Sequence, residues 1–134
     1  MLYLISRNNV QDFAGQQSDI IYLISTAQAI HQANIPFVFT DRHAKLFYAN
    51  FYSELRDLSN IDWELIESKI WHNTPALFDR KERKQAEFLV YQHLPTDLVL
   101  GITCYNTGIL RTIEQILQEN ASSIPVRAHA SWYY

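Results

Sequence analysis

A charged segment that runs directly into an apolar strand constrains this chain more than any other feature of its sequence. All six residues of Asp79–Lys84 are charged, four of them basic, whereas Phe88–Val90 are wholly apolar. Polar residues at the mouth of a buried strand are held rigidly while they face solvent or a ligand, and catalytic carboxylates often occupy such positions. The alternative interpretation is a solvated loop that leads into an ordinary strand, because runs of charge are usually solvated.

Gln85 and Glu87 stand at the junction between the two parts of this segment. Their spacing of two residues would place both side chains on one face of a strand, since successive side chains of a strand point to opposite faces. Phe88 and Val90 are then expected to face the core. The sequence therefore predicts one polar face with a carboxylate at the entrance of a strand.

The remaining pattern predicts a mixed α+β domain. Short apolar runs indicate strands, and segments with helical apolar spacing that follow Ser25 or Thr26, Asp62 and Thr107 indicate capped helices. The expected strands are 2–5, 20–24, 37–40, 88–93 and 98–105, with 124–126 and 128–134 together as the last strand, and the expected helices are 27–33, 63–70 and 108–120. Roughly six strands with antiparallel and mixed connections favour α+β, and the length of 134 residues favours a single domain, residues 1–134.

Three local expectations depend on spacing alone. Tyr48, Phe51, Tyr52 and Leu55 recur as they would on one face of a helix, which predicts core packing for residues 45–58. The helix over 63–70 is expected to turn Leu65, Ile66 and Ile70 inward, and the helix over 108–120 to turn in Ile109, Ile113, Ile116 and Leu117. The strands 88–93 and 98–105, separated by Pro95-Thr96-Asp97, are expected to form a hairpin with an open loop.

The net charge and the cysteine content limit the classes of function that this chain can have. The net charge is −3, which argues against general electrostatic adhesion to nucleic acid, so any such contact has to be local. The expected contacts are then the four basic residues of the charged segment 79–84: Arg80, Lys81, Arg83 and Lys84. The single cysteine, Cys104, excludes an internal disulfide and is typical of a reducing cytosol, and we expect it to be a buried strand residue.

Several chemistries lack their usual residues. The histidines at 31, 43, 72, 93 and 129 form no pair with metal-ligand spacing, and there is no Gly-x-Ser-x-Gly turn or glycine-rich phosphate loop. A metal-dependent nuclease built on Asp79, Glu82 and Lys84 would place these groups in a polar run, not on a strand edge. No apolar run approaches the ~18 residues of a membrane span.

Cleavage of a glycosidic bond with the help of one carboxylate is compatible with what is present. Such a reaction develops positive charge on the sugar, which a nearby carboxylate stabilises without a metal or a second nucleophile. Asp41, Arg42 and His43 follow the strand 37–40 and form a candidate site edge, where Arg42 and His43 could contact a phosphate or a ribose. Asp41 is equally readable as a turn former. The residues alone do not distinguish ADP-ribosyl transfer from other one-carboxylate reactions.

The sequence resembles the DarT family along its whole length. The most specific match is Arg83–Val90, Arg-Lys-Gln-Ala-Glu-Phe-Leu-Val, preceded by Trp71, Thr74 and Pro75. Weaker matches are Met1-Leu2-Tyr3, Phe37–Asp41, Ala49 and Trp132–Tyr134. The resemblance implies a toxin of a toxin–antitoxin pair that transfers ADP-ribose from NAD to thymidine in single-stranded DNA. It also implies an ADP-ribosyltransferase fold of two small packed β-sheets with flanking helices around an NAD cleft.

Residue by residue, the resemblance makes Glu87 the catalytic glutamate. It makes 71–83 a target-recognition loop whose Lys and Arg meet DNA phosphates and whose Trp71 could stack on a base. Gln85, His43 and Arg42 are the candidate NAD contacts, and no metal is expected.

The resemblance also implies a cytoplasmic enzyme with a macrodomain antitoxin as partner. The family carries an N-terminal segment with an NAD-contacting His and an Arg-Ser-Pro before its Met-Leu-Tyr, where this sequence starts. The family assigns removal of the thymine proton to that Arg. The expected fold is therefore incomplete at the N-terminus. Two hypotheses remain: a transferase with a mis-called start, or an inactive remnant or weak DNA-binding module.

Overall fold

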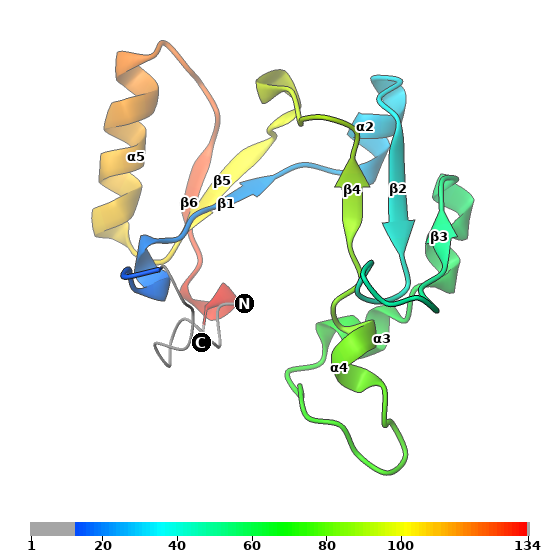
Figure 1. Cartoon of the computed structure of the whole chain (residues 1–134). Helices are drawn as coiled ribbons and strands as arrows, with labels where there is room; N and C mark the ends of the chain where they lie inside the picture. Colours follow the sequence, from blue (N-terminus) through cyan, green and yellow to red (C-terminus); the bar gives the residue numbers. More distant parts are fainter. Residues whose placement is uncertain (1–12, 134) are drawn as a thin grey trace. The chain divides into compact units, whose positions relative to one another are not determined.

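Within residues 13–133, six short strands form two three-stranded sheets (Figure 1). The computed structural model describes residues 13–133. The chain divides into two compact units: one comprises residues 27–94, and the other comprises the preceding residues together with 95 onward. Each unit contributes one sheet. The two small sheets with flanking helices confirm the predicted mixed architecture, whereas the strand expected at 2–5 lies outside the described residues.

The sheet of the unit 27–94 has β2 (Phe37–Thr40) at its centre. β3 (Phe51–Tyr52) and β4 (Phe88–Val90) pair with it from either side, and both pairings are antiparallel. Phe37 and Phe39 are buried on one face of β2, as the period of two requires. Phe88 stacks on Phe37 with ring centroids 4.9 Å apart, so the inward orientation expected for Phe88 is confirmed.

Two short helices support this sheet's unit. α2 (Ala27–Gln32) buries Ile30 and gives way to Asn34, whose φ of 55° is the left-handed conformation that ends many helices. α3 (Trp63–Glu67) begins at Asp62, whose carboxylate accepts the Leu65 N–H at 3.0 Å, so the predicted cap is confirmed. α3 is shorter than expected, because it ends before Ile70, which is 47% exposed.

The aromatic segment 45–58 is not a helix. After turns through 43–49, residues 51–52 join the free edge of β2 as β3, and a 3-10 helix, η2 (Leu55–Asn60), follows. Tyr52 packs on Phe39, but Phe51 is 57% exposed. The predicted helical face was wrong because pairing with β2 holds this segment extended at 51–52, which local spacing does not reveal.

The second sheet has β5 (Gly101–Cys104) between β1 (Tyr22–Ile24) and β6 (Val126–Ala128). β1 runs antiparallel to β5, and β6 runs parallel to it. All four residues of β5 are buried, and Cys104 is fully so, as predicted. A 3-10 helix, η1 (Gln17–Asp19), precedes β1.

The helix α5 (Thr107–Glu119) connects β5 to β6 and is the longest of the described helices. Its N-cap is Asn106, not the predicted Thr107, because the Asn106 side chain accepts the Ile109 N–H at 3.0 Å. Ile113 is buried on its inner face, while Ile116 is 52% exposed. No helix within residues 13–133 is long and apolar enough to cross a membrane.

The expected hairpin of 88–93 with 98–105 does not form. β4 pairs with β2, whereas β5 pairs with β1 and β6, so the two strands belong to different sheets. Gln92 with a φ of 61° and a 3-10 helix, η3 (Thr96–Leu98), redirect the chain between them. The C-terminal strand is also shorter than predicted, since a 3-10 helix, η4 (Ala130–Trp132), follows β6.

Candidate active site

Hydrogen bonds with the backbone and the side chain of Thr40, at the end of β2, fix the Glu87 backbone at the entrance of β4. The Thr40 N–H donates to the Glu87 carbonyl at 2.9 Å, and the Glu87 N–H donates to Thr40 Oγ1 at 3.1 Å. Thr40 is 1% exposed, so these bonds are sheltered from water. The backbone of Glu87 is therefore held in place before its side chain makes any contact.

The carboxylate of Glu87 is held on one oxygen. Oε2 accepts the backbone N–H of Ala44 at 3.0 Å and lies 3.4 Å from Nδ1 of His43. His43 Nδ1 is buried and makes no geometrically sound hydrogen bond with any atom of residues 13–133, so the 3.4 Å approach is a contact and not a bond. The Glu87 side chain is 39% exposed. This carboxylate is thus oriented by the protein and open to a ligand.

Hydrogen bonds to the Asp41 side chain hold the segment 41–50 in its conformation. Its carboxylate accepts hydrogen bonds from the Asn50 backbone and side chain, at 3.0 and 2.9 Å, and from two nitrogens of Arg42, both at 3.3 Å. Burial alone would raise the pKa of Asp41, but the hydrogen bonds from Asn50 and Arg42 outweigh it and leave the pKa below its ordinary value. Asp41 therefore closes the loop that carries His43 and Ala44 to Glu87.

Arg42 and Tyr48 join this loop to α4 (Arg80–Arg83). The Arg42 guanidinium lies 3.7 Å from the Asp79 carboxylate and 5.2 Å from the centre of the Tyr48 ring. The Tyr48 hydroxyl donates to Glu82 at 2.7 Å, and this hydrogen bond to a carboxylate raises the pKa of Tyr48. The loop beside Glu87 is consequently anchored at both ends of α4.

The basic residues of the charged segment are not all exposed. Arg80 and Lys84 are each only 9% exposed, and Arg83 pairs with Asp62 at 2.7 Å. Lys81 alone of the four is exposed. Of the four basic residues expected to contact DNA, three are therefore used in contacts within the protein, and Lys81 is the one that faces solvent.

Gln85 and Glu87 do not share a strand face. β4 starts only at Phe88, and the segment before it is a turn that follows α4. The Gln85 amide turns back to donate to the Lys81 carbonyl at 2.7 Å. The spacing argument for this pair was wrong, because the chain is not extended there.

Trp71 lies in the long connection between α3 and α4. Its ring centre is 4.9 Å from the Lys84 ammonium, and its side chain is half-buried. The connection also has internal order, since Thr74 and Leu77 form an isolated bridge and the Asn73 side chain accepts the Lys81 N–H at 3.0 Å. The one-turn helix α4 at its end was an alternative that the sequence left open, and it is present.

Sequence reasoning missed the residues that support Glu87 and His43. Asn50, Asp79, Glu82 and the Ala44 amide all contribute to the cluster. Asp79 and Glu82 were considered only as parts of a nuclease pattern, and the other two had no sequence signal. Asp41 was read as a turn former or a site edge, and its hydrogen bonds to Asn50 and Arg42 confirm the first of these readings. Within residues 13–133, no group of three or more His, Cys, Asp or Glu residues could hold a metal ion.

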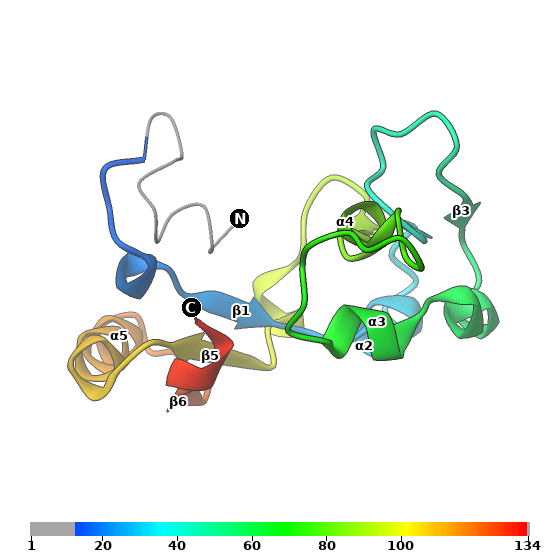
Figure 2. The same cartoon turned by 90° about the horizontal axis from the view of Figure 1, so that it is seen from below.

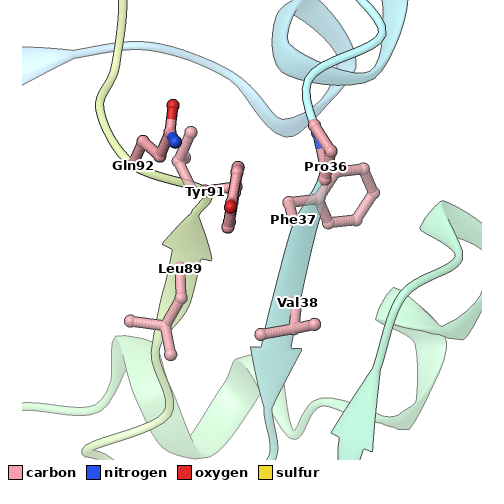
Figure 3. A pocket seen from close by; sticks show the side chains of 7 residues that line it. Pro36, Phe37, Val38, Leu89, Tyr91 and Gln92 are labelled. Atoms are coloured by element: carbon pink, nitrogen blue, oxygen red, sulfur yellow. The ribbon is translucent and has the colours of Figure 1, made fainter.

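A shallow hollow of about 300 Å³ lies at the opposite end of β4 from Glu87. Figure 3 shows Val38 of β2 and Leu89 of β4 lining it, with Tyr91 beyond the end of the strand. Its lining is mainly apolar and does not include Glu87 or His43. It is separate from the carboxylate site.

Comparison with known proteins identifies the family. Residues 1–134 match the model of a family described as ssDNA thymidine ADP-ribosyltransferase. The chain belongs to this family, which is called DarT, so the resemblance in its sequence is confirmed.

Two curated relatives named DNA ADP-ribosyl transferase illustrate the similarity. The protein of Thermus sp. (strain 2.9) is 40% identical over 136 residues, covering 100% of this chain and 63% of the relative. The protein of Escherichia coli O127:H6 is 34% identical over 116 residues, covering 87% of this chain and 53% of the relative. The chain therefore spans between half and two thirds of the length of these relatives.

Solved structures agree with this assignment. Thermus sp. 2.9 DarT in complex with NAD+ superposes with a TM-score of 0.91 at 38% identity, covering 99% of this chain and 66% of that one. The same protein in complex with ADP-ribosylated ssDNA also gives a TM-score of 0.91 at 38% identity, covering 99% of this chain and 63% of that one.

Proposed function

We propose that this chain transfers ADP-ribose from NAD to thymidine bases of single-stranded DNA, with Glu87 as its catalytic residue. The observation that carries the proposal is the fixed and accessible carboxylate of Glu87, held by the Ala44 N–H at 3.0 Å beside His43. Membership of the DarT family, together with DarT complexes that contain NAD+ and ADP-ribosylated ssDNA, supplies the substrates.

Glu87 acts on the ribose. NAD supplies the bond that breaks: nicotinamide leaves with the electron pair of its bond to the ribose, and positive charge develops on the sugar. The Glu87 carboxylate stabilises that charge, and Oε1, which makes no hydrogen bond within residues 13–133, is placed to accept a ribose hydroxyl. A thymine ring nitrogen then forms the new bond, and the reaction releases one proton.

His43 and Arg42 are assigned to NAD, each with a different contribution. His43 lies against the catalytic carboxylate and so stands next to the ribose position. Arg42 is held by Asp41 and Asp79, which leaves it to orient the loop 41–50 and present positive charge at the edge of the site. Gln85 stays a candidate contact only through its exposed position near Glu87.

DNA is assigned to the connection before α4. Lys81 is exposed and available to a phosphate, and the half-buried Trp71 ring offers a partial stacking surface for a base. Arg80, Arg83 and Lys84 are committed to protein contacts and are not assigned to DNA. By family analogy we also propose a cytoplasmic location and a macrodomain antitoxin that reverses the modification.

The test is transfer of labelled ADP-ribose from NAD to thymine-containing single-stranded oligonucleotides. Glu87→Gln preserves shape but removes the charge, so we expect kcat to fall by about 100-fold or more. Glu67→Gln, an exposed glutamate of α3, is the matched control and should match the unaltered chain. Absence of transfer by the unaltered chain, or full transfer by Glu87→Gln, would overturn the proposal.

A further inference from the structure

The ammonium of Lys84 is fully used inside the protein. Its Nζ donates to the carbonyls of Leu65 at 3.0 Å, Ile66 at 2.6 Å and Ser68 at 2.5 Å. An ammonium has three N–H donors, and here each has a backbone acceptor. Lys84 is therefore saturated before any ligand arrives.

These carbonyls lie at the C-terminal end of α3, where a helix leaves its last C=O groups without intrahelical partners. A cation at this end also interacts favourably with the helix dipole. Burial, with a smaller effect of the neighbouring Arg80 charge, lowers the pKa of Lys84. The same ammonium lies 4.9 Å from the Trp71 ring centre, so Lys84 connects the end of α3 to the start of the long connection.

α3 and α4 are neighbouring helices (Figure 2), and side chains at the end of α4 contact both ends of α3. Arg83 pairs with Asp62, the N-cap of α3, while Lys84 binds the carbonyls at the other end and Arg80 donates weakly to Ser68 Oγ at 3.4 Å. The connection 69–79 leaves from this clamp and returns to it. Glu87 follows Lys84 by only three residues. The contacts of Arg83 and Lys84 with α3 therefore hold one end of the connection and lie next to the segment that carries the carboxylate.

We infer that Lys84 is a positioning residue for the proposed reaction: its ammonium fixes where the connection 69–79 stands relative to Glu87. The inference rests on the proposed function for its kinetic consequence and on the contacts above for its structural one. Lys84 is thereby distinguished from Lys81, which lies on the same helical turn but faces solvent. Lys84 thus holds the DNA-facing segment in place through buried contacts, whereas Lys81 contacts the DNA directly.

Salt dependence of oligonucleotide binding separates these two roles. Lys84→Met, which keeps length but removes the charge, should weaken binding by about fivefold or more at every salt concentration and leave the slope of log Kd against log salt unchanged. Lys81→Met should lower that slope by about 1, as loss of one phosphate contact does. A reduced slope in Lys84→Met would show a direct phosphate contact and overturn the inference.

Hydrogen exchange tests the structural part without any need for activity. In Lys84→Met the amides of the connection, including that of Leu77 bonded to the Thr74 carbonyl at 3.0 Å, should exchange about tenfold faster or more. Lys84→Arg, which keeps a buried cation, should restore most of the protection, and Lys81→Met should keep it.

Unchanged exchange in folded Lys84→Met would overturn the inference. If Lys84→Met does not fold, Lys84→Gln, which removes the charge but keeps polar N–H donors, takes its place. Faster exchange in the connection supports the inference, and unchanged exchange together with unchanged binding overturns it. Absence of ADP-ribosyl transfer by the unaltered chain would refute the proposed function, while the exchange result would still decide the role of Lys84.

Discussion

Replacement of Thr40 by valine removes the hydroxyl oxygen that holds the Glu87 backbone and leaves the rest of the side chain nearly unchanged in shape. The two side chains have the same shape, but valine lacks the oxygen that accepts the Glu87 N–H at 3.1 Å. Because Thr40 is 1% exposed, water does not replace the lost acceptor. A buried donor left without a partner costs about 1–3 kcal/mol.

That cost translates into a measurable shift in thermal stability. For a chain of this length, each kcal/mol corresponds to about 3 °C in Tm, so Thr40→Val should melt about 3–9 °C lower. Urea titration followed by circular dichroism should give the same free energy with an unchanged m-value. Transfer activity, measured well below the Tm, should also fall, because the Glu87 backbone is less tightly fixed.

The control for this substitution lies in the other sheet. Thr103 in β5 is also 1% exposed, but its hydroxyl makes no hydrogen bond within residues 13–133. Thr103→Val should therefore not lower the free energy of unfolding, because it removes a buried hydroxyl that has no partner among the described residues to lose. Equal stabilities for Thr40→Val and Thr103→Val would refute the reasoning that the Thr40 hydroxyl supports Glu87.

Two further substitutions test the supports of the site. The lowered pKa of the Asp41 carboxyl adds stability that is complete above the ordinary value of 3.8 and is lost as pH falls through the folded-state value. Asp41→Asn should therefore be less stable than the unaltered chain at pH 6, and its free energy of unfolding, from urea titrations, should fall less steeply as the pH is lowered. An unchanged pH dependence at acid pH would contradict this. Asp62→Ala removes the acceptor of the Leu65 N–H and the partner of Arg83, and should lower the free energy of unfolding by about 1–2 kcal/mol in the same titration. Glu64→Ala on the same helix is the control. Equal losses of stability in Asp62→Ala and Glu64→Ala would contradict the capping role.

The parts of the site that sequence revealed are those with a local signal. The change from charge to apolar residues marked the entrance of β4, and the family resemblance singled out Glu87 there. Asp62 was found because a capping residue precedes its helix directly. In each case the interacting groups are close in sequence, or a motif names the residue.

The parts that sequence missed depend on backbone groups or on distant pairing. Lys84 is buried because its ammonium reaches carbonyls 16 to 19 residues away, and carbonyls carry no sequence signature. The run 48–55 has helical spacing by coincidence, and the edge of β2 decides its conformation. The expected hairpin failed for the same reason, since β4 and β5 find partners in separate sheets.

The hydrogen bond from the Ala44 backbone to Glu87 has a consequence for sequence variation. Every amino acid except proline supplies this N–H, so substitutions at position 44 can accumulate without disturbing the carboxylate, provided the loop keeps its shape. A comparison of sequences would rank such a position as unimportant, although its amide is one of the groups that hold the Glu87 carboxylate. Proline is the one replacement that should abolish this contact, and its exclusion would be the only trace that natural selection leaves there.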